Sequence, residues 1–148
     1  MKEKLRLLIY IPAGGILAIL LNLLITASGL PDLFPYYKEN AAPALFSVHA
    51  RAAVLLYLIA APILEELVFR FFLFNLLQKK LALIPSAVIS SLLFGLYHGN
   101  AVQAVYAFLM GMAFSLLYEK DHRFSVPVIL HASAYASVYY LLPLIPIN

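Results

Sequence analysis

The sequence contains no cysteine and few charged residues. Without thiols the chain can form no disulfide, no thiolate nucleophile and no cysteine-ligated zinc site. Only 11% of its 148 residues are charged, whereas a soluble domain usually carries about a quarter, because its surface must face water. With 64% hydrophobic residues and a mean hydropathy of +0.94, the chain is predicted to be an integral membrane protein. Its length suits a single domain, 1–148.

The few charged residues divide the chain into apolar runs. The first run covers 7–30, the second 52–78 and the last 124–148. Residues 81–118 carry no charge, but this stretch is too long for one span, and Gly99-Asn100 is the expected break. A helix needs about 20 residues to cross a hydrocarbon layer of about 30 Å. The pattern therefore predicts an all-α bundle of about five transmembrane helices.

Basic residues fall mostly on one side of this arrangement. The chain has a net charge of +3 without a dense basic patch, so nucleic acid is not expected as a partner. Because cytoplasmic loops of membrane proteins carry an excess of Lys and Arg, the bias predicts a cytoplasmic N-terminus and an external C-terminus. The basic residues on the cytoplasmic side would be Lys2, Lys4, Arg6, Lys79, Lys80, Lys120 and Arg123, against Lys38 and Arg51 outside.

Three charged residues lie inside the second run: Glu65, Glu66 and Arg70. An ionisable group at membrane depth costs several kcal/mol, so each needs a partner or a function. Glu66 and Arg70 are four residues apart, the spacing at which helical side chains meet, and we expect them to form an ion pair. Glu65 points about 100° away around the helix and has no basic residue one turn before or after it. It is therefore expected to be a free carboxylate.

Two histidines, His98 and His131, also lie within apolar runs. Phe94 precedes His98 by one helical turn, on the same face. Either histidine alone would be explained by a hydrogen bond to a neighbouring helix. Together with Glu65 they place a carboxylate and two imidazoles on three different helices, which is what general acid–base chemistry requires.

These residues resemble a known family. Glu65-Glu66-x-x-x-Arg70, Phe94-x-x-x-His98 and the late His131 resemble, in order, the three motifs of the CPBP family. Its members are CAAX-protease and bacteriocin-processing membrane proteases, also called Abi or Rce1-like glutamic proteases. The resemblance covers about residues 61–140, within a motif-bearing core at about 52–142. It implies an intramembrane peptide hydrolase without a cofactor, in the cell membrane of a prokaryote.

The resemblance also implies roles for the residues. Glu65 would activate a water molecule, His98 would hold that water, and His131 would stabilise the oxyanion together with Tyr135. Tyr135 is a departure, because the family usually has Asn or Asp four residues after the last histidine. Glu66, Arg70 and Phe94 would support the site.

The sequence leaves other functions open. Glu65, His98 and His131 could ligate zinc, although there is no His-Glu-x-x-His helix and Arg70 is expected to engage Glu66. A non-catalytic membrane protein, such as a bacteriocin immunity factor or a proton-coupled carrier, could use the same cluster. The expected partner is a peptide or protein at the membrane. Its cleaved segment could be a prenylated C-terminus, a leader peptide or a C-terminal sorting helix.

Overall fold

The computed structural model describes residues 2–34 and 56–145, and in these ranges the chain is helical without strands. The polar connection expected at 31–51 lies mostly outside the described residues, as do Lys38 and Arg51. The elements follow one another as α1 (Lys2–Ala27), η1 (Leu30–Leu33), η2 (Leu56–Ala60), α5 (Ala61–Glu66), η3 (Leu67–Phe74), α6 (Asn75–Gln78), α7 (Leu83–Tyr97), α8 (Ala101–Asp121), α9 (Ser125–Tyr140) and η4 (Leu142–Leu144). The all-α prediction is confirmed for this part of the chain.

Helices occur in all five predicted runs, but they differ in length. Among the described residues, three helical stretches are long and apolar enough to cross a membrane, namely Leu7–Ala27, Ala101–Asp121 and Ser125–Leu144. The helix α7 has only 15 residues, or about 22 Å at 1.5 Å per residue, which is less than a hydrocarbon layer. Residues 56–78 form one unbroken rod in which α and π turns alternate. Of the five predicted spans, three are thus long enough in the described residues to cross a membrane as single helices.

The predicted break in the charge-free stretch is confirmed. Helix α7 ends at Tyr97, and Gly99 then adopts a left-handed conformation with φ of 63°, which a residue without Cβ tolerates. The side chain of Asn100 accepts a hydrogen bond from the amide of Gln103 at 3.0 Å and so caps α8. At the other end, α7 begins only after Ala82, which is extended. Gly99-Asn100 located the break but did not show how short α7 would be.

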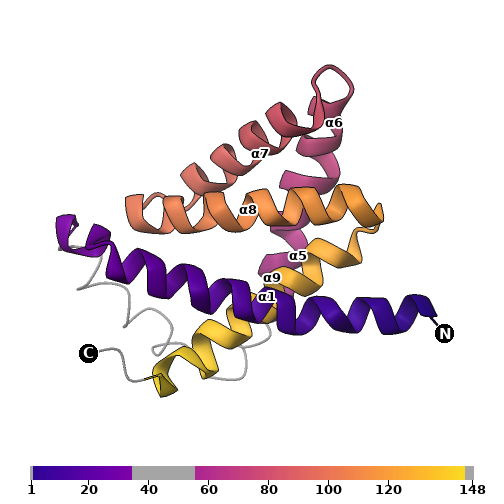
Figure 1. The fold of residues 1–148 in the computed structure, drawn as a ribbon. Coiled ribbons are helices and arrows are strands. Elements are labelled where there is room, and N and C mark those ends of the chain that lie inside the picture. Colours follow the sequence, from indigo (N-terminus) through magenta and orange to yellow (C-terminus); the bar gives the residue numbers. More distant parts are fainter. Residues whose placement is uncertain (1, 35–55, 146–148) are drawn as a thin grey trace.

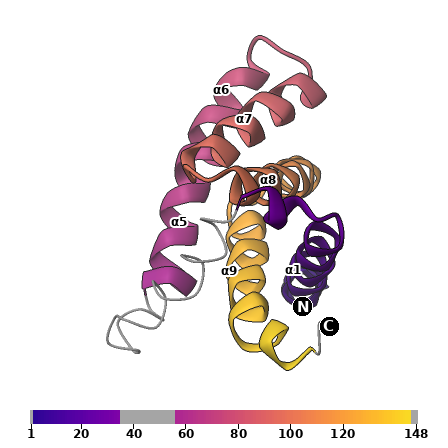
Figure 2. The same cartoon turned by 90° about the vertical axis from the view of Figure 1, so that its left-hand side faces the viewer.

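The helices form two groups that meet at α8. Figure 1 shows α1 and α8 running in opposite directions, with the hairpin of α6 and α7 extending away from them. In Figure 2, α1 and α8 are seen nearly end on, and the rod that contains α5 and α6 crosses their direction steeply. Helix α9 passes between α1 and this rod, and it packs against both. The rod, α7, α8 and α9 therefore meet near the centre of the molecule.

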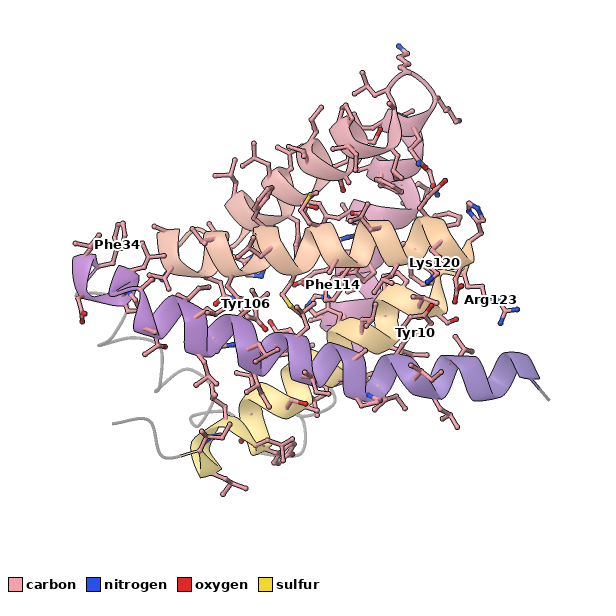
Figure 3. All side chains as sticks on the ribbon, in the orientation of Figure 1. Tyr10, Phe34, Tyr106, Phe114, Lys120 and Arg123 are labelled. Atoms are coloured by element: carbon pink, nitrogen blue, oxygen red, sulfur yellow. The ribbon has the colours of Figure 1, made fainter. Side chains whose placement is uncertain are left out.

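Polar contacts tie the helix ends together. Tyr10 donates a hydrogen bond to Asp121 at 2.7 Å, and the Asn75 amide donates one to the Tyr118 hydroxyl at 2.9 Å. Figure 3 shows Lys120 and Arg123 at the same end of the molecule as Tyr10. This placement agrees with the predicted sharing of one side by the N-terminal basic residues and the loop after α8. Many large apolar side chains on the outside, such as Leu24 and Leu96, are more than half exposed, as lipid-facing residues are.

Candidate active site

The two glutamates lie on the irregular rod. Helix α5, which carries Glu65 and Glu66, is preceded by the π turn Leu56–Ala60 and followed by the π-helical segment Leu67–Phe74. Pro62 lies in the first turn of α5 and has no amide hydrogen to donate, so a regular hydrogen-bond ladder cannot continue through it. Segments of π-helix are rare and often occur at functional sites. The helix type therefore changes next to Pro62.

Glu66 and Arg70 form the predicted ion pair, and both side chains are fully buried. Arg70 Nη1 donates to Glu66 Oε1 at 3.2 Å, and Nε lies 3.2 Å from Oε2 without the alignment of a hydrogen bond. The guanidinium carbon lies 4.3 Å from the ring centre of Phe94 and 5.4 Å from that of Phe114. Contact with aromatic faces stabilises a cation that has left water. Glu66 and the two rings thus compensate the buried charge.

His131 lies between the two carboxylates. Its Nδ1 is 2.8 Å from Glu66 Oε1, and its Nε2 is 3.6 Å from Glu65 Oε2. Because Glu66 Oε1 also accepts the hydrogen bond from Arg70, Nδ1–H of His131 is assigned as the donor and the carboxylate oxygen as the acceptor. The expectation that Glu66 serves mainly Arg70 is therefore incomplete, since Glu66 also orients His131. Glu66 and His131 are 65 residues apart, so no local sequence pattern could have predicted their contact.

His98 joins the cluster from α7. Its Nδ1–H donates to the Phe94 carbonyl oxygen at 2.8 Å, which leaves Nε2 as the acceptor of a neutral ring. The Phe94 ring lies edge-on to both imidazoles, with centroid distances of 5.0 Å to His98 and 5.7 Å to His131. Glu65 interacts electrostatically with both histidines. The structure thus brings together the three residues that the sequence singled out.

Tyr135 lies one turn after His131 and stacks on it, with ring centres 5.3 Å apart and an interplanar angle of 16°. The sequence suggested a hydrogen-bond donor in place of the usual Asn or Asp. The contact observed with His131 is a ring stack, which restricts the rotation of the imidazole. A role of the phenol in oxyanion binding stays a prediction.

Sequence reasoning missed Phe114, a residue of α8 that completes the surroundings of the cluster. Its ring contacts His131 at a centroid distance of 5.2 Å as well as Arg70. Figure 3 shows it near the centre of the molecule, where α8 meets α9. No motif includes this residue, and one phenylalanine among the 10 in this chain carries no signal of its own.

Ser90 on α7 contacts the rod directly. Its hydroxyl donates to the carbonyl oxygen of Phe69 at 2.6 Å, within the π-helical segment that follows Glu66. Ser90 lies on the same face of α7 as Phe94 and His98, at successive intervals of four residues. That spacing was the available signal, although it did not identify the partner.

The residues proposed as zinc ligands do not form a ligand set. Within 2–34 and 56–145, no group of three or more His, Cys, Asp or Glu side chains is arranged to hold a metal ion. Whether the protein binds a metal stays a question for experiment.

The fold and the cluster define a class: an integral membrane protein of packed helices with a buried carboxylate–histidine site. Residues 47–137, more than half of the chain, match the family described as Type II CAAX prenyl endopeptidase Rce1-like. The chain belongs to this family, as the motifs predicted.

Two curated relatives are similar to part of the chain. A putative membrane peptidase, YdiL, from Bacillus subtilis (strain 168) is 36% identical over 73 residues, which is 49% of this chain and 30% of the relative. The membrane-embedded CAAX protease MroQ from Staphylococcus aureus (strain USA300) is 38% identical over 79 residues, covering 49% of this chain and 32% of the relative. The similarity thus spans about a third of each relative. No solved structure matches the chain.

Proposed function

We propose that the protein is an intramembrane endopeptidase that cleaves a membrane-associated peptide with a water molecule activated by Glu65. The observation that carries the proposal is the position of His131, held by Glu66 on one ring nitrogen and facing Glu65 with the other. A carboxylate that orients a histidine toward a second reactive group is a recurrent arrangement in hydrolases. Membership in the Rce1-like family supports the same reaction class.

Glu65 is the carboxylate suited to be the base. Glu66 is fully buried and already accepts hydrogen bonds from both Arg70 and His131, so its charge is used for structure. Glu65 has a side chain that is 14% exposed, and among the described residues no arginine or lysine forms an ion pair with it. It takes a proton from water, and the water oxygen forms a bond with the carbonyl carbon of the substrate.

His98 would orient the attacking water. Its Nδ1–H is engaged by the Phe94 carbonyl, so the lone pair on Nε2 can accept the second hydrogen of the water. With Glu65 accepting the first hydrogen, the water oxygen is directed away from both acceptors and toward the substrate. The role rests on the tautomer that the hydrogen bond to Phe94 selects.

His131 would stabilise the oxyanion that forms when the water attacks. With Nδ1–H donated to Glu66, a hydrogen carried on Nε2 would face the reacting carbonyl. One donor of this kind contributes about 3–4 kcal/mol in comparable sites. The proton held by Glu65 finally passes to the amide nitrogen, and the carbon–nitrogen bond breaks.

The substrate would be a C-terminal or leader segment of a membrane-associated protein. The family description names a CAAX prenyl endopeptidase and the S. aureus relative is named a CAAX protease, which favours a C-terminal segment. The distribution of basic residues favours a cytoplasmic N-terminus, and Tyr10, Lys120 and Arg123 lie at one end of the molecule, as a common cytoplasmic side would require.

The test compares peptide termini in membranes that contain the wild-type protein or the Glu65→Gln variant. Mass spectrometry of these membranes should reveal new termini that require the wild-type protein and disappear with Glu65→Gln at equal protein levels. Equal sets of termini in wild-type, variant and empty membranes would overturn the proposal.

A further inference from the structure

Helix α8 carries none of the family motifs quoted above, yet it touches Arg70 at a position without a side chain. A Cβ atom placed on Gly111 would lie 2.6 Å from Arg70 Nη2. That distance is shorter than any carbon–nitrogen contact that a relaxed structure keeps. An alanine at this position would therefore compete with the guanidinium for the same space.

The guanidinium cannot easily move aside. Two of its nitrogens, Nε and Nη1, lie 3.2 Å from the oxygens of Glu66, and this ion pair fixes the plane of the guanidinium. Because a guanidinium is planar and rigid, the place of the third nitrogen, Nη2, then follows from the other two. Nη2 is buried and has no hydrogen-bond partner among the described residues. Glu66 therefore sets its position, and that position lies against Gly111.

The new side chain could not move away from the guanidinium either. The Cβ on Gly111 would also lie 3.1 Å from the Cβ and the hydroxyl oxygen of Ser91 on α7, on a helix that packs closely on α8. Arg70, Ser91 and the α8 backbone thus enclose the position. Phe94 and Phe114 contact Arg70 through their rings and limit its movement further.

The geometry points to Gly111 as a positioning residue for the active site. By lacking a side chain it admits the Arg70 guanidinium, which holds the Glu66 carboxylate where it accepts the Nδ1 hydrogen of His131. Gly111 touches no reacting group and acts only through Arg70. The inference rests on the proposed function for its catalytic consequence, but its structural part can be measured without a substrate.

The test is a double-mutant cycle read by thermal unfolding in detergent. Gly111→Ala should lower the melting temperature by roughly 2–10 °C in the wild-type background, as overpacking does. In an Arg70→Lys background, which has no Nη2, the same change should have less than half of that effect. Should Arg70→Lys not fold, the background is Glu66→Gln/Arg70→Met, which removes both charges together.

Gly95→Ala is the matched control. A Cβ on Gly95 would lie 2.6 Å from the carbonyl oxygen of Ala104, the same distance in the same α7–α8 contact, but against backbone. Gly95→Ala should lower the melting temperature equally in the wild-type and Arg70→Lys backgrounds, because its new methyl group does not contact Arg70. If Gly111→Ala were equally harmful with and without Arg70, Gly111 would be a packing residue only and the inference would be overturned.

A second measurement distinguishes positioning from general packing. In protein labelled with ¹⁵N-histidine, Gly111→Ala should shift the ring nitrogen signals of His131, assigned with His131→Gln, and leave those of the exposed His122 unchanged. Unchanged His131 signals would overturn the inference. If the coupling and the shift are found but no Glu65-dependent peptide termini exist, the proposed protease function fails while the role of Gly111 toward Arg70 stands.

Discussion

Gly14 on α1 and Gly111 on α8 are both glycines at which a side chain would collide with a neighbouring helix, but the neighbours differ. Gly14 faces the hydroxyl of Ser133 and the backbone at Leu130 on α9, whereas Gly111 faces the charged end of Arg70. The α1–α9 contact is thus a close approach of two backbones, of the kind that small residues allow in membranes. The α7–α8 contact instead encloses the guanidinium of Arg70, which binds Glu66 in the candidate active site.

The comparison shows why a repeat of small residues is ambiguous in a sequence. Ala107, Gly111 and Ser115 recur at every fourth position, and the pattern predicts plain packing of helices. All three are indeed buried. Only at Gly111 does the missing side chain admit a group from the site. Perturbing the two contacts separately should therefore have different consequences.

The largest effect is expected from Glu66→Gln, which leaves Arg70 charged and without its partner. Breaking one side of a buried ion pair costs about 3–5 kcal/mol, so the free energy of unfolding in mixed micelles should fall by this amount. Glu66→Gln/Arg70→Met is the control, because it removes both charges and should recover most of the loss. A fully stable Glu66→Gln protein would show that the charge of Arg70 is compensated elsewhere.

Gly14→Ala should perturb the uncharged α1–α9 contact. The new methyl group would meet the α9 backbone at Leu130, which cannot rotate away, and the free energy of unfolding should fall by about 1–3 kcal/mol. Gly15→Ala offers the matched control, since its methyl group would meet the flexible hydroxyl of Ser137 and should cost less. An equal loss of unfolding free energy at both positions would contradict this account. It would mean that α1 and α9 move apart to admit either methyl group.

Ser90→Ala should have a smaller effect, located at the π-helical segment. Without the hydroxyl, the carbonyl of Phe69 loses a partner, and the expected loss is about 1–2 kcal/mol. Ser86→Ala is the control, because Ser86 is equally buried and bonds to the carbonyl of Ala82, the residue that directly precedes its own helix. Chemical unfolding of both variants would measure the difference. A larger loss for Ser86→Ala would contradict the assigned role of Ser90.

The smallest effect is expected from metal removal. Since Glu65, His98 and His131 are not arranged as a ligand set, exhaustive treatment with EDTA and phenanthroline should change the yield of Glu65-dependent termini by less than about twofold. Purified protein analysed for bound zinc provides the check. Stoichiometric zinc, with activity lost on its removal and restored on its return, would establish the zinc-dependent alternative.

The sequence predicted much of the fold because charge is so costly in a bilayer. Lys79 and Lys80 marked one loop, and the charged residues at 119–123 marked the end of α8, which continues to Asp121 before the turn to α9. The length of α7 was not predictable in the same way. It depends on the extended Ala82 and the left-handed Gly99, which are local backbone choices inside an uncharged stretch.

The candidate site was predicted in its members but not in its contacts. Glu65, His98 and His131 stood out because each is polar within an apolar run, and the Glu66–Arg70 pair follows from helical spacing. The hydrogen bond between His131 and Glu66 joins α9 to α5 and depends on how the helices cross. Phe114 and Gly111 were missed for the same reason, since apolar and small residues are common in every span.

The central claim is that two adjacent carboxylates have separate tasks, Glu65 in the reaction and Glu66 in holding Arg70 and His131. The most direct measurement compares Glu65→Gln and Glu66→Gln for both melting temperature and yield of the wild-type-dependent peptide termini, per folded molecule. The account predicts that Glu65→Gln melts within a few degrees of the wild type and forms no such termini, whereas Glu66→Gln melts well below both. A Glu65→Gln protein that still cleaves, beside a stable and inactive Glu66→Gln protein, would contradict it.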